Sequence, residues 1–213
     1  MRGNLFHFLF PLIVSIAILC VSVPLHSQVL LNELLADPAT DWNGDGVVNF
    51  RDDEWVEIIN TGSETVSLDG LLITDGERDG TVRFAFSGSI SAGGVLVVYG
   101  SEAKAWEEAN GLPVYGLSLN NAGDTVSLLK VSGSDTILVD SISFGDKSAE
   151  DDRAVGRKQN EREIWALFDA YNPCTSNCEF VATGCIPTPG SVNECVTATE
   201  EKSWGAIKSI YGD

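Results

Sequence analysis

Apolar and polar positions alternate in short runs along most of the chain. The first runs are QVLLNELL at 28–35 and EWVEII at 54–59. Further runs rich in β-branched residues occur at 65–68, 71–74, 82–86, 95–99, 125–130 and 137–144. Short strands separated by Gly, Ser, Asn and Asp are typical of an all-β sandwich. The pattern therefore predicts one all-β domain of sandwich type.

Helical spacing is found in two places. The segment EAKAWEEA at 102–109 ends before Asn110 and Gly111, which predicts one short helix between strands. The C-terminal tail, 197–213, carries a potential cap at Thr199 and an apolar stripe. The stripe consists of Trp204, Ile207 and Tyr211. We expect a short amphipathic helix there. This tail could pack on the domain, recruit a partner, act as a sorting signal, or be a frayed terminus without a role.

Within the strand WVEII, alternation predicts two opposite faces. Trp55, Glu57 and Ile59 share one face, and Val56 and Ile58 share the other. Glu57 is then a carboxylate either at the sheet surface or buried and satisfied by N–H groups near Asn32 or Asn60. We favour a structural role for it. Asp124, after an Asn-Asn-Ala-Gly run, is expected to accept hydrogen bonds in a turn.

The N-terminal residues 1–27 have the order of a secretory signal peptide. Arg2 precedes an apolar run from Leu5 to about Val23, and the small Ser27 stands before the expected cleavage point. A membrane anchor is the alternative, but a histidine and a proline interrupt the run, and it is shorter than the roughly 20 residues needed to span a bilayer. A lipoprotein signal with lipidation at Cys20 is a less favoured interpretation, because the bulky Leu19 precedes this cysteine where such sites have a small residue.

The stretch DWNGDGVVNFRD, residues 41–52, has the spacing of an EF-hand calcium loop. The expected metal ligands are Asp41, Asn43, Asp45, Asn49 and Asp52 by their side chains and Val47 by its carbonyl. Ca²⁺ takes about 6 to 8 oxygens at roughly 2.3 to 2.6 Å, which a tightly curled loop can supply. Gly46 stands where that loop turns sharply. The sequence therefore predicts a bound Ca²⁺.

The last position of this loop departs from calcium sensors. Asp52 replaces the longer Glu, as in the loops of dockerin modules, which this one resembles; Asp53 and Glu54 are alternative ligands. A strand pattern follows the loop where a helix would complete an EF-hand. We expect a calcium loop outside an EF-hand. The competing interpretation is a solvated acidic turn.

Charge narrows the classes of function. The whole chain carries a formal charge of −18, and removing 1–27 takes away Arg2 but no acid, leaving 12 basic minus 31 acidic residues, or −19. Such a surface disfavours nucleic acid and suits divalent cations.

Both histidines, His7 and His26, lie in the segment expected to be removed. The mature chain would then have no histidine for a Ser-His-Asp triad, a Cys-His catalytic pair or a zinc site. Paired carboxylates can hydrolyse glycosides, but no spacing singles out a pair.

Four cysteines lie near the C-terminal end. They are Cys174, Cys178, Cys185 and Cys195. In an exported protein they predict two disulfides, with three pairings open. A four-thiolate zinc site is the alternative, although the usual C-x2-C pairs are missing. We expect disulfides that staple the C-terminal end of the domain.

Several motifs in this order resemble the bacterial lamin-tail domain, a secreted relative of the immunoglobulin-like domain of nuclear lamins. They are LNELLADP at 31–38, DDEWVEIIN at 52–60, VSLDGLLITDG at 66–76, ISAGGVLVVYG at 90–100, LSLNNAGDTVSLL at 117–129, VDSISFGD at 139–146 and TPGSVN at 188–193. The resemblance implies an immunoglobulin-like β-sandwich over about 28–196, extracellular or cell-surface placement and an interaction role. It supplies no catalytic residue.

Taken together, these patterns predict a secreted, calcium-binding, non-catalytic module. Its partner is expected to be a protein or polysaccharide at the cell surface, or another copy of itself, and no membrane span remains after signal removal. One alternative is a structural component of an extracellular matrix or surface layer. Another is an accessory module of a secreted calcium-dependent hydrolase or nuclease.

Overall fold

The computed structural model describes residues 28–76 and 80–197, so the expected signal peptide and almost all of the expected tail helix lie outside the described residues. The elements are β1 (Val29–Leu35), β2 (Trp55–Asn60), β3 (Val66–Ser67), β4 (Leu71–Asp75), β5 (Thr81–Ala85), β6 (Ser89–Ile90), β7 (Val95–Tyr99), α1 (Gly100–Ala109), β8 (Gly123–Ser132), β9 (Asp135–Gly145), β10 (Ala154–Lys158), β11 (Glu161–Phe168) and β12 (Val181–Ala182).

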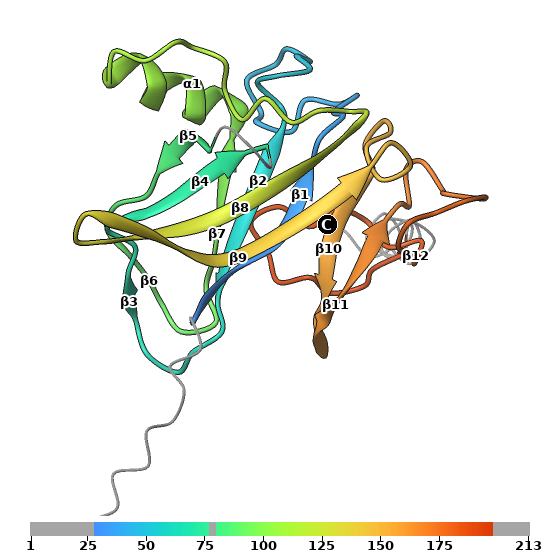
Figure 1. Cartoon of the computed structure of the whole chain (residues 1–213). Helices are drawn as coiled ribbons and strands as arrows, with labels where there is room; N and C mark the ends of the chain where they lie inside the picture. Colours follow the sequence, from blue (N-terminus) through green and yellow to red (C-terminus); the bar gives the residue numbers. More distant parts are fainter. Residues whose placement is uncertain (1–27, 77–79, 198–213) are drawn as a thin grey trace, which may run out of the picture.

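Two sheets form the domain (Figure 1). The larger has the strand order β12-β11-β10-β1-β2-β7, the smaller has β5-β4-β8-β9, and β3 and β6 form a separate short ribbon. Neighbouring strands are antiparallel, except that β12 runs parallel to β11. The predicted all-β, immunoglobulin-like sandwich with one short helix is confirmed. Helix α1 begins two residues earlier than the pattern predicts.

The main core lies between the two sheets. Val56 and Ile58 of β2 meet Ile73 of β4 and Val126 and Leu128 of β8, and all five side chains are buried. Burying an aliphatic side chain of this size stabilises a fold by about 1.5 to 3 kcal/mol. The β-branched runs thus form strands because each delivers its apolar face to this interior.

A second apolar cluster covers the outer face of the large sheet. Trp55 and Leu35 pack there with Phe168, and the loop residue Trp42 lies against them with ring centroids 6.2 Å from Trp55. The alternation predicted for WVEII is confirmed, since Val56 and Ile58 face the main core and Trp55 faces outward. Both faces of β2 are therefore covered, and every residue of that strand is buried.

Strands β10 and β11 are absent from the sequence prediction. Their sequences, AVGRK and EREIWALF, carry charged residues where a strand pattern requires apolar ones. Arg157 is nevertheless buried, because it pairs with Asp140 at 2.8 Å and lies 4.4 Å over the Trp165 ring. Partners supplied by other strands replace the missing hydrophobic pattern.

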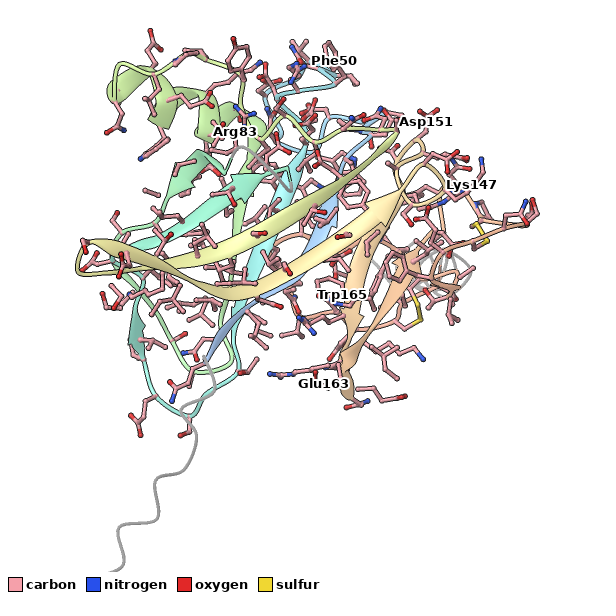
Figure 2. All side chains as sticks on the ribbon, in the orientation of Figure 1. Phe50, Arg83, Lys147, Asp151, Glu163 and Trp165 are labelled. Atoms are coloured by element: carbon pink, nitrogen blue, oxygen red, sulfur yellow. A yellow bond between two sulfur atoms is a disulfide. The ribbon has the colours of Figure 1, made fainter. Side chains whose placement is uncertain are left out.

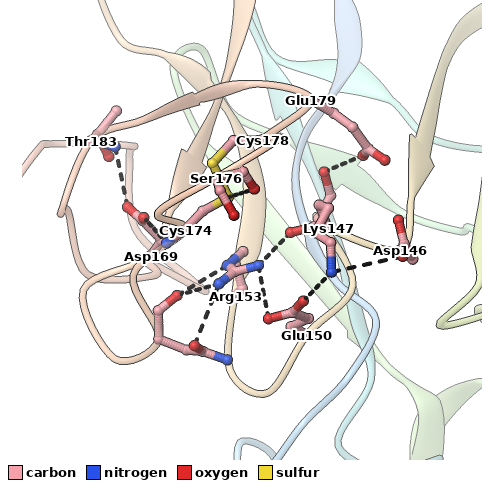
Figure 3. Close-up of a disulfide and its surroundings, with 12 residues drawn as sticks. Asp146, Lys147, Glu150, Arg153, Asp169, Cys174, Ser176, Cys178, Glu179 and Thr183 are labelled. Atoms are coloured by element: carbon pink, nitrogen blue, oxygen red, sulfur yellow. Dashed lines mark hydrogen bonds and ion pairs between the residues drawn. A yellow bond between two sulfur atoms is a disulfide. The ribbon is translucent and has the colours of Figure 1, made fainter.

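The four cysteines form two disulfides, as predicted, with the pairing Cys174–Cys178 and Cys185–Cys195. This leaves none of the four for the alternative zinc site. Figure 3 shows the first disulfide beside Asp169, whose carboxylate accepts hydrogen bonds from Cys174 N at 2.8 Å and Thr183 N at 3.1 Å. A buried acid therefore holds the backbone around the disulfides in place.

A buried guanidinium anchors the same end of the domain (Figure 3). Arg153 donates to the Asn172 carbonyl at 3.0 and 2.8 Å and to the Lys147 carbonyl, and it pairs with Glu150 at 3.3 Å. Backbone carbonyls thus accept most of the guanidinium hydrogen bonds, and the acid that pairs with Arg153, Glu150, is partly exposed. The segment after β11 is thus joined to the loop before β10.

Candidate metal loop

The loop 41–52 folds around the side chain of its first residue. Asp41 Oδ1 accepts hydrogen bonds from Gly44 N at 2.8 Å and Asp45 N at 3.1 Å, and Oδ2 accepts one from Gly46 N at 2.8 Å. Gly44 and Gly46 have φ values of +76° and +91°, a region that residues with a Cβ rarely adopt. The sequence curls here because both turns fall on glycine.

The next two expected ligands continue this pattern. Asn43 Oδ1 accepts from Asp45 N at 2.9 Å, and Asp45 Oδ1 accepts from Val47 N at 2.8 Å. The Asn43 amide nitrogen also lies 3.3 Å from Asp45 Oδ2. The structure therefore brings Asp41, Asn43 and Asp45 together. Their carboxylate and amide oxygens are the donors that Ca²⁺ prefers.

The end of the loop is arranged differently. Asn49 Oδ1 accepts from Arg51 N at 3.0 Å and Asp52 N at 3.3 Å. Asp52 turns to helix α1, where its carboxylate forms an ion pair with Lys104. Within residues 28–76 and 80–197, no three carboxylate, histidine or cysteine side chains gather as a metal-binding group. The carboxylate of the twelfth position is thus directed away from the first half of the loop, although the Asp52 carbonyl lies 3.5 Å from Asn43 Nδ2.

Asp53, an alternative ligand in the sequence analysis, instead holds the two ends of the loop together by hydrogen bonds. It is completely buried, and it accepts hydrogen bonds from three backbone N–H groups: Trp42 at 2.9 Å, Asn43 at 3.0 Å and Asn49 at 2.7 Å. These three donors satisfy the buried side chain and tie it to both ends of the loop. Spacing alone does not reveal this role, which depends on both ends of the loop meeting at one carboxylate.

Helix α1 fixes the position of the loop end. Gly100 N donates to Glu54 O at 2.8 Å, and Ser101 N donates to Asp52 O at 3.1 Å. A Cβ on Gly100 would lie 1.7 Å from the Arg51 carbonyl oxygen. Only glycine permits this approach, so the helix start and the loop end form one unit.

Glu54, the other substitute ligand, is 2% exposed and accepts a hydrogen bond from Leu119 N at 3.2 Å. Burial raises its pKa to about 8. Asp75 is close enough to Glu54 to act on its charge, and burial together with Asp124 raises the pKa of Asp75 to about 7. Arg83 pairs with Asp75 at 3.0 Å. This interior is acidic and only partly neutralised.

Asp124 acts as the predicted turn acceptor. Its carboxylate accepts from Asn120 N at 2.9 Å and from Thr125 N at 2.7 Å. The turn that it closes leads directly into β8, beside Asp75 of β4. The acid therefore shapes the loop that faces Glu54.

A separate polar network lies on the outer face of the large sheet. Glu57 accepts from Asn32 Nδ2 at 2.5 Å and Gly190 N at 2.7 Å, and Glu33 accepts from Thr188 N at 3.1 Å and Thr188 Oγ1 at 2.6 Å. Burial raises the pKa of Glu33 to about 8 and that of Glu57 to about 7. Of the two alternatives left open for Glu57, the structure shows the buried one, with its carboxylate held by hydrogen bonds. Its donors are a side-chain amide and a distant glycine, whereas the Asn60 turn contributes none.

These carboxylates hold one segment in place. Residues 186–194, which we call the strap, lie between Cys185 and Cys195 and include the motif TPGSVN. The disulfide closes the strap at its two ends, and the two buried acids hold it over β1 and β2. Threonine and glycine in this motif therefore supply donors to acids more than a hundred residues earlier in the chain.

Two packed sheets with a single helix among the described residues define an immunoglobulin-like β-sandwich module. The family described as Lamin Tail Domain matches residues 23–146, and the chain belongs to this family. The match ends before β10, short of the Asn193 reached by the sequence resemblance. No curated protein matches the chain. Among the described residues, no helix has the length and apolar character required to cross a membrane.

Proposed function

We propose that this chain is an exported interaction module whose loop 41–52 binds Ca²⁺ for stability. Residues 1–27 would direct export, residues 28–196 would form the module, and its partner would be a protein or polysaccharide at the cell surface. The observation that carries the metal proposal is the inward-turned carboxylate of Asp41, surrounded by loop N–H groups and next to Asp45. Oxygen ligands at alternating positions are the donor set of a hard cation.

The residues of the loop fit Ca²⁺. Asp41, Asn43 and Asp45, together with the Val47 carbonyl and Asn49, would hold the ion, and Asp52 would join by leaving Lys104. The ion would neutralise carboxylates that otherwise repel one another. Because Asp53 already fixes both ends of the loop, binding would order a short segment only. The role of the ion would be structural.

Lack of catalysis is supported by how the buried acids are used. Glu33, Glu57 and Asp53 each accept hydrogen bonds from backbone or amide groups that hold a loop or the strap. A general acid or base needs access to a substrate, which these covered positions do not offer. The acids of this domain therefore serve its architecture.

The test is thermal unfolding of the mature protein in EGTA, in millimolar CaCl₂ and in millimolar MgCl₂. Native-state binding at about 100 times Kd adds about 2.7 kcal/mol, so Ca²⁺ should raise the Tm by several degrees. Asp45→Ala should abolish the shift. Asp135→Ala, an exposed acid at the β8–β9 turn, is the matched control and should retain it. An identical Tm in all three solutions would reduce the loop to an acidic turn.

A surface-layer or matrix component is the second candidate, and the outer end of the β8–β9 hairpin favours it. β9 is an edge strand, and Ile137 and Leu138 on it are 55% and 59% exposed. Exposed apolar edge strands are templates for pairing with another chain. Self-association through this edge would appear in sedimentation velocity as a concentration-dependent dimer, which Leu138→Lys should abolish.

A further inference from the structure

A cavity of about 430 Å³ lies beside the loop and is not explained by calcium binding. Phe50, Arg51 and Glu54 form one wall, and Ser118, Asn120 and Asn121 form the other. The volume is within the range of about 300 to 1,000 Å³ typical of small-molecule sites. One wall comes from residues 50–54 and the other from residues 118–121, and strands β2 to β7 and helix α1 lie between these two segments in the chain. The cavity therefore exists only in the folded domain.

The walls are held in place by their own contacts. Arg51 Nη1 donates to Ser118 Oγ at 3.0 Å, and Glu54 accepts from Leu119 N at 3.2 Å. Ser118 has φ +60°, an unusual conformation for a residue that is not glycine. Strained backbone of this kind is concentrated at binding sites. The cavity is therefore a formed site before any ligand arrives.

Several hydrogen-bonding groups in the cavity are not used by the protein. Within the described part of the chain, Arg51 Nε and Nη2 and Asn120 Nδ2 have no protein partner, whereas Asn120 Oδ1 accepts from Ala122 N at 2.9 Å. The carboxyl group of Glu54 contributes acceptor oxygens from a side chain that is 2% exposed. Donors and acceptors thus stand together around one space.

An aromatic ring completes the rim. Phe50 is 66% exposed, belongs to neither apolar cluster, and has the Arg51 guanidinium 5.4 Å from its ring centroid. Figure 2 shows Phe50 at the edge of the molecule near α1. An exposed aromatic face next to mixed polar groups suits a ligand with one apolar face and several hydroxyls.

We propose that this cavity binds a neutral sugar unit of an oligosaccharide. A pyranose hydroxyl both donates and accepts, so vicinal hydroxyls match the guanidinium, amide and carboxyl groups of Arg51, Asn120 and Glu54. The C–H face of the ring matches Phe50. The assignment names the ligand of the interaction module and rests on that proposal.

Charge selects against anionic ligands. The chain carries a formal charge of −18, so a uronic acid or a phosphate would approach a protein of like charge. A single guanidinium, already bonded to Ser118 and Tyr115, does not offset this. Neutral glycans avoid the conflict.

The experiment is titration calorimetry of the mature protein, in calcium buffer, with four neutral probes and one acidic probe. The neutral probes are cellohexaose, xylohexaose, mannohexaose and chitohexaose, and the acidic one is hexagalacturonate. At least one neutral probe should bind with a Kd of millimolar or tighter. Phe50→Ala and Arg51→Lys should each weaken that probe about tenfold, which corresponds to about 1.4 kcal/mol. Val181→Ala, at an exposed apolar residue of β12, should leave the Kd unchanged.

Failure of all four neutral probes, binding of the acidic probe alone, or Kd values that neither cavity variant changes would each overturn the proposal. Unchanged Tm values of the variants verify that the fold is intact, since Phe50 is exposed and Lys keeps the charge of Arg51. A calcium-dependent Tm without glycan binding refutes the glycan site and leaves the calcium loop in place. Glycan binding without any response to calcium refutes the loop and leaves the cavity.

Discussion

Asn32 and Asn193 lie 161 residues apart in the chain and hydrogen-bond each other on the outer face of the large sheet. Asn32 Nδ2 lies 2.5 Å from Asn193 Oδ1, and Asn193 Nδ2 donates to Asn32 O at 3.2 Å and Arg157 O at 2.9 Å. Both residues are buried, so each amide depends on the other for its partners. One asparagine of the strap thus joins three separate parts of the chain.

Asn193→Ala should lower the free energy of unfolding by about 2 kcal/mol, because it leaves buried carbonyl and amide groups without partners. Urea denaturation followed by tryptophan fluorescence measures this change. Asn160→Ala, at the exposed β10–β11 turn, should change stability by less than about 0.5 kcal/mol. Equal effects of the two substitutions would show that the strap contributes nothing to stability.

Stability should rise as pH falls from about 8 to about 5. Burial raises the pKa of Glu33 and Glu57 from an ordinary 4.5 to about 8 and about 7, so the folded state binds protons that the unfolded state releases. Their contribution is fully present below about pH 4.5 and is lost as pH rises through 7 to 8. Glu54 and Asp75 act in the same direction.

Urea denaturation at pH 5 and pH 8 tests this prediction. Glu57→Gln cannot ionise, so the difference between the two pH values should shrink by on the order of 2 kcal/mol. Glu194→Gln, on the exposed side of the strap, should keep the full difference. A wild-type protein more stable at pH 8 than at pH 5 would contradict the prediction.

The two disulfides should contribute unequally. Opening Cys185–Cys195 by a double Ser substitution should cost about 3 kcal/mol, and opening Cys174–Cys178 about 2 kcal/mol, because the second closes a shorter loop. Thermal unfolding of both double variants gives the order, and peptide mapping of the unreduced protein verifies the pairing. A larger loss for the Cys174–Cys178 variant would contradict the loop-entropy explanation.

Lys104→Ala should tighten calcium binding. Lys104 holds Asp52 away from the first half of the loop, so its removal frees the twelfth ligand. A partly exposed ion pair is worth up to about 1 kcal/mol, which sets the expected gain at up to about fivefold in Kd. Calcium titration calorimetry measures it. Lys147→Ala removes ion pairs with Asp146 and Glu150 elsewhere and should leave the Kd unchanged; weaker binding by Lys104→Ala would refute the competition.

The sequence predicts those strands that bury apolar residues against the main core. Val56, Ile58 and Val126 alternate with their neighbours, and the structure places them between the two sheets. β10 escapes prediction because Arg157 takes its partners from Asp140 and Leu31 O, contacts between distant segments that no local pattern contains. Pairing of the cysteines was open for the same reason, since spacing does not specify which ends meet.

The candidate site shows the same division. Asp41 and Asp45 come together as the loop spacing predicts, because Gly44 and Gly46 permit the necessary turns. Asp52 does not join them, because Lys104, far along the chain on α1, pairs with it. The sequence also did not predict that Asp53 holds the two ends of the loop together. Asp52, Asp53 and Glu54 are consecutive acids before a strand, and the spacing does not distinguish among them.

The large sheet takes β1 from the beginning of the domain and places β10 directly beside it, with Glu33 opposite Gly156. During synthesis, β1 can pair with β2 early, but its other edge stays open until β10 has been made. Domains that rely on such distant pairings fold slowly, since a long loop must close before the contacts form. The strap and its disulfide then complete the outer face last. A nascent chain stopped after residue 146 would therefore present an unpaired strand edge, which makes it a natural target for chaperones.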